Sequence, residues 1–221
     1  MVRIKEVTAI MLTQNKKRQR LVRMSMQSFF GQTYPHRRLL IVNSGIPIFT
    51  ENNPPPPNVK EVVVEYNPKM TIGELRNIGL EHCETELFIV WDDDDWRRED
   101  FLQTMADAYE EGTAVCLRRL TNYDMANNKI YVMEMKEGTV ASSLQPKDRR
   151  RYPHIMFCEG VFKEQGPYKI LDNDPQIFVR LYHGDNVCGD GVMNWDGYRS
   201  TVEISESDGV NSAVRSIYNV S

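Results

Sequence analysis

Four consecutive aspartates, Asp92–Asp95, are the residues of this chain best suited to chemistry. They directly follow Glu86 to Trp91 (ELFIVW), an apolar stretch with the length and composition of a buried strand. Adjacent carboxylates repel one another and lose solvation when buried, so we expect a cation to neutralise them. Oxygen ligands in a short turn favour Mg²⁺ or Mn²⁺, held jointly with a substrate phosphate. The alternative is a solvated acidic turn that caps the next helix, for which one aspartate would be enough.

Two clusters of basic residues are further candidates for binding. Lys16 to Arg23 lies in an expected helix, where the simplest interpretation is the solvated face of that helix. Lys147 to Arg151 lies in an expected loop and is suited to a diphosphate or to a polyanionic acceptor such as nucleic acid. Charge alone does not separate these alternatives.

The elements that must position the acidic residues alternate between strand and helix over the first half of the chain. Expected strands cover residues 6–13, 38–42, 59–65 and 86–91. Expected helices cover residues 16–30, 71–82 and 97–111, the second opening with a capping box at Thr71 and Glu74. Such alternation predicts an α/β fold with a mainly parallel sheet flanked by helices on both faces.

The second half of the chain has a less regular pattern. We expect strands over residues 114–120, 129–135 and 176–183, a loop over 142–160, and a short helix over 209–218. Neither a repeat nor a clear boundary divides the sequence, so a single compact domain over residues 1–221 is predicted.

Composition restricts the class of protein. Of the 221 residues, 41% are hydrophobic and the formal net charge is −4, which is ordinary for a globular protein and excludes a generally basic nucleic-acid coat. No apolar run approaches the roughly 18 residues that a membrane span needs. The four cysteines form no C-x-x-C pair, which argues against a zinc knuckle. With no secretory segment at the N-terminus, a cytoplasmic chain with reduced cysteines is expected.

Five short segments between residues 6 and 105 carry a family resemblance. In chain order they are Val7–Asn15 (VTAIMLTQN), Ser28–Tyr34 (SFFGQTY), Leu40–Gly45 (LIVNSG), Gly73–Asn77 (GELRN) and Phe88–Trp96 (FIVWDDDDW). They resemble the motifs of family 2 nucleotide-sugar glycosyltransferases with the GT-A fold. This resemblance implies a GT-A-like, Rossmann-like domain with a nucleotide-sugar-binding half over residues 1–111 and an acceptor-binding half over 112–221.

The resemblance also implies an activity. Such a protein is a metal-dependent glycosyltransferase that moves a sugar from a nucleotide diphosphate sugar to an acceptor hydroxyl, with inversion, and that uses Mn²⁺ or Mg²⁺. The acceptor stays open among a sugar, a lipid, a protein and a modified DNA base. Two alternatives are a catalytically silent nucleotide-sugar-binding protein of the same fold and a sugar-nucleotide pyrophosphorylase. The pyrophosphorylase would need a glycine-rich phosphate loop after the first strand, where this chain has TQNKKRQR.

Roles in binding the donor follow from the resemblance, residue by residue. Thr13 and Asn15 would line the nucleotide pocket, and Arg76 would contact the diphosphate or brace the acidic turn. Asp92 and Asp94 match the two aspartates of a D-x-D motif, with Asp93 between them and Asp95 in the third acidic position. We assign Asp92 and Asp93 to the nucleotide, and Asp94 and Asp95 to the cation.

A later segment, Asp174 to Asn186 (DPQIFVRLYHGDN), resembles a C-terminal motif of some family members. His183 would then close over the diphosphate or serve as a further metal ligand; alternatively it is only a histidine at a strand end.

Two positions depart from the family pattern. Asn43 stands where the family has a base-reading aspartate, and its amide offers a donor as well as an acceptor, so a base other than uracil or a different contact with uracil is expected. The catalytic base expected in an inverting enzyme is also altered, since Gly160 stands at the aspartate position. Glu159 is the nearest carboxylate and our candidate, with Asp172 and Asp174 as alternatives.

Overall fold

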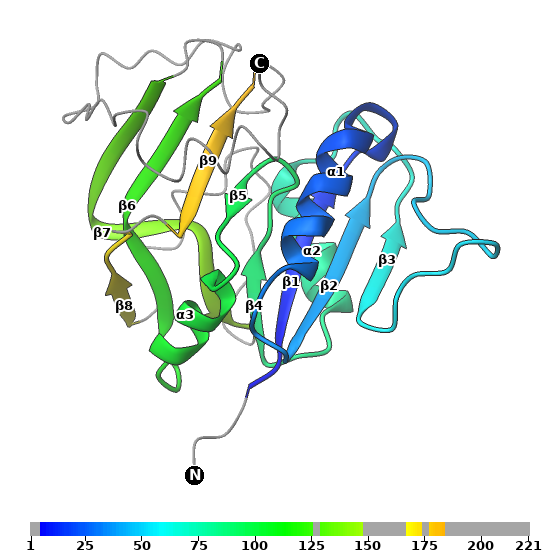
Figure 1. Ribbon diagram of the computed structural model, residues 1–221. Helices are drawn as coiled ribbons and strands as arrows, with labels where there is room; N and C mark the ends of the chain where they lie inside the picture. The colour runs from blue at the N-terminus through cyan, green and yellow to red at the C-terminus, as the bar shows by residue number, and fades with distance from the viewer. Residues whose placement is uncertain (1–4, 126–128, 148–166, 174–176, 184–221) are drawn as a thin grey trace.

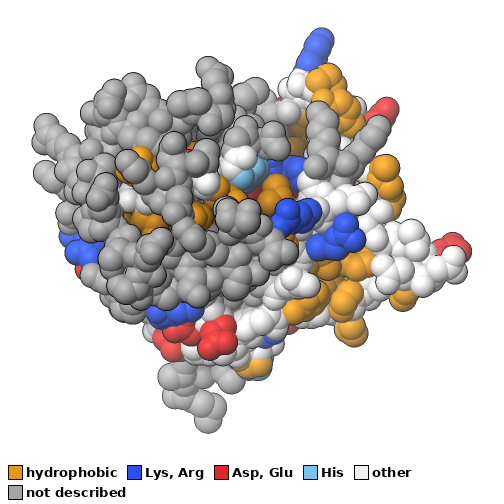
Figure 2. Space-filling view, turned by 45° about the horizontal axis from the view of Figure 1, so that its top comes forward, with side chains coloured by type: hydrophobic (Ala, Val, Ile, Leu, Met, Phe, Trp, Pro, Cys, Tyr) orange, Lys and Arg blue, Asp and Glu red, His pale blue; other side chains and the backbone are white. Residues whose placement is uncertain are grey.

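The computed structural model describes residues 5–125, 129–147, 167–173 and 177–183, and the other residues are grey in the ribbon view (Figure 1) and in the space-filling view (Figure 2). Nine strands of this part form one mixed sheet in the order β3-β2-β1-β4-β7-β6-β9-β5, with β8 paired to β6. Three helices pack on it, and together they make a single α/β domain, as predicted. No helix within the described ranges combines the length and the apolar character needed to cross a bilayer.

The four strands of the first half are parallel. They are β1 (Val7–Thr13), β2 (Arg37–Asn43), β3 (Val59–Val63) and β4 (Leu87–Val90), and they lie in the order β3-β2-β1-β4. Their apolar runs are continuous because both faces of the sheet are covered. Each strand matches a predicted one to within two residues at either end.

Helices cover both faces of the parallel strands. The helices are α1 (Asn15–Phe30), α2 (Ile72–His82) and α3 (Phe101–Ala108). Alternate residues of β1 divide between two cores: Met11 packs in the core that includes Phe29 of α1 and Phe101 of α3. Ile10 packs in the other core with Leu80 of α2. The predicted capping box is present, with Thr71 and Glu74 each accepting from the other's backbone N–H.

Helix α2 lies unusually close to the sheet at Gly79. A Cβ placed there would be 2.6 Å from Cγ2 of Ile10 and 3.4 Å from Cγ2 of Val42. Glycine at this position therefore permits a distance between helix and sheet that a larger residue would not allow.

One long strand joins the two halves of the domain. β7 (Lys129–Pro146) pairs antiparallel with β4 at one end and with β6 (Ala114–Asp124) along most of its length. Beyond it, β6 pairs in parallel with both β8 (Tyr168–Leu171) and β9 (Phe178–Tyr182). In Figure 1 the second half is dominated by these strands, whereas α1 and α2 lie with the parallel half.

Several sequence predictions need correction. The helix predicted over 97–111 is shorter, because Trp96–Arg97 forms strand β5 against β9 and α3 begins only at Phe101. Residues 142–146 belong to β7, where a loop was predicted, and β8 was not foreseen. The predicted helix over 209–218 lies outside the described residues.

Cys83 and Cys116 are buried, and the expectation of reduced cysteines stays a prediction. Cys158 and Cys188 lie outside the described residues.

Candidate functional site

The four aspartates Asp92–Asp95, which we call the acidic turn, lie where the central parallel strands end. The backbone N–H of Trp91 still donates to the carbonyl of Ile10, at 2.9 Å, and the turn follows at once. β1 ends beside it at Thr13, and Thr13 is paired in register with Asn43, the last residue of β2. In open α/β sheets, ligands bind at this carboxyl edge of the strands.

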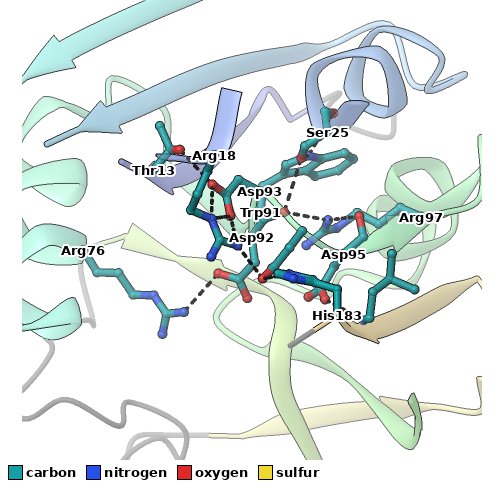
Figure 3. Close-up of polar contacts among 12 residues, drawn as sticks. Thr13, Arg18, Ser25, Arg76, Trp91, Asp92, Asp93, Asp95, Arg97 and His183 are labelled. Carbon is teal, nitrogen blue, oxygen red and sulfur yellow. Dashed lines mark hydrogen bonds and ion pairs between the residues drawn. The ribbon is translucent and has the colours of Figure 1, made fainter. Parts of the chain in front are cut away.

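Asp93 points toward β1 and α1 (Figure 3). The Thr13 hydroxyl donates to its Oδ2 at 2.7 Å. Arg18 donates to the same carboxylate from Nε, at 2.9 and 3.1 Å, and from Nη2, at 2.8 Å. Two segments distant in the sequence thus hold this side chain, which is buried.

Asp94 joins the first half of the site to the second. Nη2 of Arg18 lies 2.5 Å from Oδ2 of Asp94. Nε2 of His183, which follows β9, lies 3.2 Å from the same oxygen. Two residues predicted to bind the cation, Asp94 and His183, are therefore brought together although 89 positions separate them.

Asp92 has the most exposed side chain of the three aspartates on the open side of the turn. Its exposed fraction is 30%, against 14% for Asp94 and 6% for Asp93. Nη2 of Arg76, from α2, lies 3.3 Å from Oδ1 of Asp92. Arg76 thus braces the acidic turn, which is one of the two roles predicted for it.

Asp95 points into the protein, toward β9. It is 3% exposed, and its Oδ1 accepts from the backbone N–H of Leu181 at 3.3 Å. Burial raises the pKa of Asp95 well above its ordinary value, and the charges of Asp94 and Asp92 raise it further. Its contact with β9 differs from the metal-binding role predicted from the sequence, a role that stays a prediction.

Arg97 fixes the backbone of the turn from inside the fold. Its guanidinium carbon lies 4.2 Å from the centre of the Trp91 ring, and the side chain is buried. Nη1 of Arg97 donates to the carbonyls of Asp92 and Asp95, at 3.3 Å in both cases. Ser25 of α1 donates to the Asp92 carbonyl as well, at 3.3 Å. Side chains from elsewhere in the fold therefore contact both the backbone and the carboxylates of the turn.

The charged groups of this cluster shift one another's pKa values. The pKa of Asp93 is raised to about 6, because burial and the charge of Asp94 raise it by more than Arg18 and Thr13 lower it. Burial raises the pKa of Asp94, but the hydrogen bond with His183 and the charge of Arg18 lower it by more, so the pKa lies below its ordinary value. Burial lowers the pKa of Arg18, yet the charges of Asp93 and Asp94 outweigh it and the net shift is upward. Arg18 therefore stays charged and serves as the counter-ion of the turn.

The donor set suits a cation that is shared with a substrate. Carboxylate oxygens are ligands for Mg²⁺ and Mn²⁺, and Asp94 with His183 supplies two converging donors. No group of three or more potential ligands converges within the part of the chain that the structure describes. Asp94 and His183 are therefore the described residues that would hold such a cation.

Asn43 uses both hydrogens of its amide inside the protein. Nδ2 donates to the carbonyl of Ile46 at 2.8 Å and to Oε1 of Glu61 at 2.7 Å. Glu61 is itself fixed, because its carboxylate also accepts from the backbone N–H groups of Ile48 and Phe49. The amide donor expected from the sequence therefore serves the fold.

The candidate bases are only partly placed. Glu159 and Asp174 lie outside the described residues. The side chain of Asn15, predicted to line the nucleotide pocket, is not described either. Asp172 is half exposed, and its Oδ1 lies 3.4 Å from Nε of Arg119 on β6.

The structure places one residue of each basic cluster away from its expected position, whereas residues 148–151 lie outside the described residues. Lys147 donates to the Cys83 carbonyl, and its backbone N–H donates to Glu86, which places it at the opposite end of β4 from the acidic turn. Arg18 points into the acidic turn and not to the solvent, so the interpretation of Lys16 to Arg23 as a purely solvated face is wrong at this residue. Arg97 was missed as a functional residue, because nothing in the sequence distinguishes it from Arg98, which follows it.

Comparison with known proteins identifies the fold independently. The sequence profile of glycosyl transferase family 2 matches residues 8–164, which is more than half of the chain. No curated protein matches the sequence closely enough to count as a relative.

Solved structures of S. aureus TarS resemble this fold. A crystal structure of S. aureus TarS residues 1–349 in complex with UDP-GlcNAc superposes with a TM-score of 0.61 at 14% identity, covering 80% of this chain and 59% of that one. The corresponding complex with UDP gives a TM-score of 0.58 at 13% identity, with 80% and 60% coverage. A longer TarS structure gives 0.58 at 15% identity, and there the match spans only 36% of the TarS chain. The match therefore covers less than two thirds of each of these TarS chains.

Proposed function

The chain belongs to glycosyl transferase family 2, and from this premise we propose that it transfers a glycosyl group from a nucleotide diphosphate sugar to an acceptor hydroxyl. The observation that carries the proposal is the acidic turn at the carboxyl edge of the parallel strands, with Asp94 and His183 in contact and Arg76 on Asp92. We further propose that Mg²⁺ or Mn²⁺ assists the reaction and that the anomeric carbon is inverted.

The proposed donor site divides between the two sides of the acidic turn. Thr13, Asn15, Asn43, Arg76, Asp92 and Asp93 form its nucleotide side. Asp94, Asp95 and His183 form its cation side, where the Asp94–His183 contact is the best-supported part. When bound, a divalent cation supplies positive charge that offsets the charge developing on the leaving diphosphate.

A uracil-containing donor is the first to test. TarS, which shares the fold, has been crystallised with UDP and with UDP-GlcNAc.

Inversion requires a base that removes the proton of the acceptor hydroxyl. Glu159 is our candidate, with Asp174 as an alternative. The third candidate, Asp172, is half exposed, and its Oδ1 lies 3.4 Å from Nε of Arg119.

The test is donor turnover by the wild-type chain and by Asp94→Asn. With UDP-GlcNAc and Mn²⁺, we expect release of UDP that stops on chelation and falls by about 100-fold or more in Asp94→Asn. Asp107→Asn is the matched control, because Asp107 is an exposed aspartate of α3, and it should leave the rate unchanged. Equal rates in wild type and Asp94→Asn would refute the assigned role of the acidic turn. Donor binding without turnover would favour the alternative of a catalytically silent binding protein.

A further inference from the structure

Arg18 differs from the other basic residues around it on α1. Its side chain is 15% exposed, whereas Arg23, one and a half turns further along the helix, is exposed to solvent. The backbone at Arg18 departs from helical geometry, with φ −119° and ψ 20°, so α1 is kinked at this residue. The kink and the burial together show that Arg18 is part of the site around the acidic turn and is not a surface charge.

The guanidinium of Arg18 bridges two carboxylates of the acidic turn. Its Nε and Nη2 donate to both oxygens of Asp93, at 2.8 to 3.1 Å. Nη2 also donates to Oδ2 of Asp94 at 2.5 Å. A planar guanidinium is suited to such a fork across two acids, which the compact ammonium of lysine cannot reproduce.

One oxygen of Asp94 is shared between Arg18 and the proposed cation site. Oδ2 of Asp94 is the atom that Arg18 contacts, and it is also the atom that lies 3.2 Å from Nε2 of His183. A divalent cation that approaches this oxygen meets a positive charge already in place, and the two compete for the same lone pairs. The contacts of Arg18 with Asp93 do not involve this atom and can persist when Asp94 is taken.

We propose that Arg18 is the counter-charge that holds the acidic turn together in the cation-free protein and that gives up Asp94 when a divalent cation binds. This inference rests on the proposed function only in so far as it takes the cation to bind at Asp94. Arg18 is then a positioning residue with two opposite effects: it stabilises the empty site by relieving carboxylate repulsion, and it weakens cation binding by occupying a ligand. Removing it must shift these two properties in opposite directions.

The experiment compares the whole wild-type chain with Arg18→Gln after treatment with a chelator. Titration calorimetry with MnCl₂ gives the cation affinity, and thermal unfolding in the presence of chelator gives the stability of the empty site. We expect Arg18→Gln to bind Mn²⁺ at least about tenfold more tightly than the wild type. This change in affinity corresponds to the loss of one competing charge-assisted hydrogen bond. Its cation-free melting temperature should fall, and added Mn²⁺ should raise it by more than in the wild type.

Arg23→Gln is the matched control, because it removes the same charge from an exposed position of the same helix. It should change neither property. Arg18→Lys keeps the charge but not the guanidinium that contacts both carboxylates, so its Mn²⁺ affinity and its melting temperature should lie between those of wild type and Arg18→Gln. If Arg18→Gln does not fold, Arg18→Lys replaces it in the test. Equal or weaker Mn²⁺ binding by both Arg18 variants would overturn the competition. Mn²⁺ binding to none of the proteins, wild type included, with or without UDP present, would instead overturn the cation in the proposed function and the competition with it.

Discussion

Replacing Arg97 by methionine is the sharpest test of how the acidic turn is built. The Arg97 side chain is 3% exposed and stacks on Trp91, with the rings of Phe178 and Phe101 at 5.2 and 5.9 Å. It donates to the carbonyls at both ends of the turn. Methionine fills much of the same volume, so the substitution removes charge and hydrogen bonds and leaves little cavity.

The expected loss of unfolding free energy can be worked from these contacts. Two hydrogen bonds of 3.3 Å are long, so we assign each about 1 kcal/mol, less than the usual value for a charged donor. A desolvated cation–π contact contributes about 2 kcal/mol. Asp95 also loses a buried counter-charge. The sum is about 3–5 kcal/mol, as for removal of one partner of a buried ion pair, and a large part of a typical domain's stability.

Urea unfolding followed by tryptophan fluorescence measures this loss, and one of the three tryptophans, Trp91, contacts the substituted side chain. The matched control is Arg98→Met at the next position, because Arg98 is about one-third exposed and pairs with Asp100 at the surface. We expect the control to cost less than about 1 kcal/mol. If Arg97→Met cost no more than Arg98→Met, the view that a buried guanidinium organises the turn would be refuted.

Three further changes test other parts of the structure. Gly79→Ala should destabilise by about 1–3 kcal/mol through overpacking against the sheet, whereas Gly31→Ala, where a Cβ meets only ordinary contacts, should be near neutral; thermal unfolding of both variants checks this. Thr71→Ala removes the capping box of α2 and should cost about 1 kcal/mol in urea unfolding. In chelator, the pKa of Asp93 is raised to about 6 and that of Asp95 is raised too, so the folded state binds protons more tightly than the unfolded chain. Stability should therefore increase as the pH falls from 7 through 6, and Asp95→Asn should flatten this rise in a series of melting curves.

The parallel half of the fold was predictable because its signals are local. The strands at residues 7–13 and 87–90 are short apolar runs with polar residues at their ends, and burial on both faces produces that pattern. The capping box of α2 was equally visible, since it needs only Thr71 and Glu74. The acidic turn was found for the same reason: its charges are adjacent in the sequence, so their mutual repulsion can be deduced without a structure.

The errors concern residues whose environment comes from far away in the chain. Residues 96–97 continue naturally into a helix, but pairing with β9 draws them into the sheet and α3 begins later. Arg18 and Arg97 are charged residues that sequence patterns assign to solvent, and only the folded chain brings Arg18 to Asp93 and Arg97 to Trp91. Tertiary contacts of this kind override local preference.

The long separations within the site bear on the order in which the domain folds. Arg18 and Thr13 contact the acidic turn from 75 and 80 positions earlier in the chain. Leu181 and His183 contact it from 86 and 89 positions later. Contacts of such range form only after large loops have closed. Until then the four carboxylates repel one another without compensation, so the turn is assembled late, on a scaffold of strands that has already collapsed.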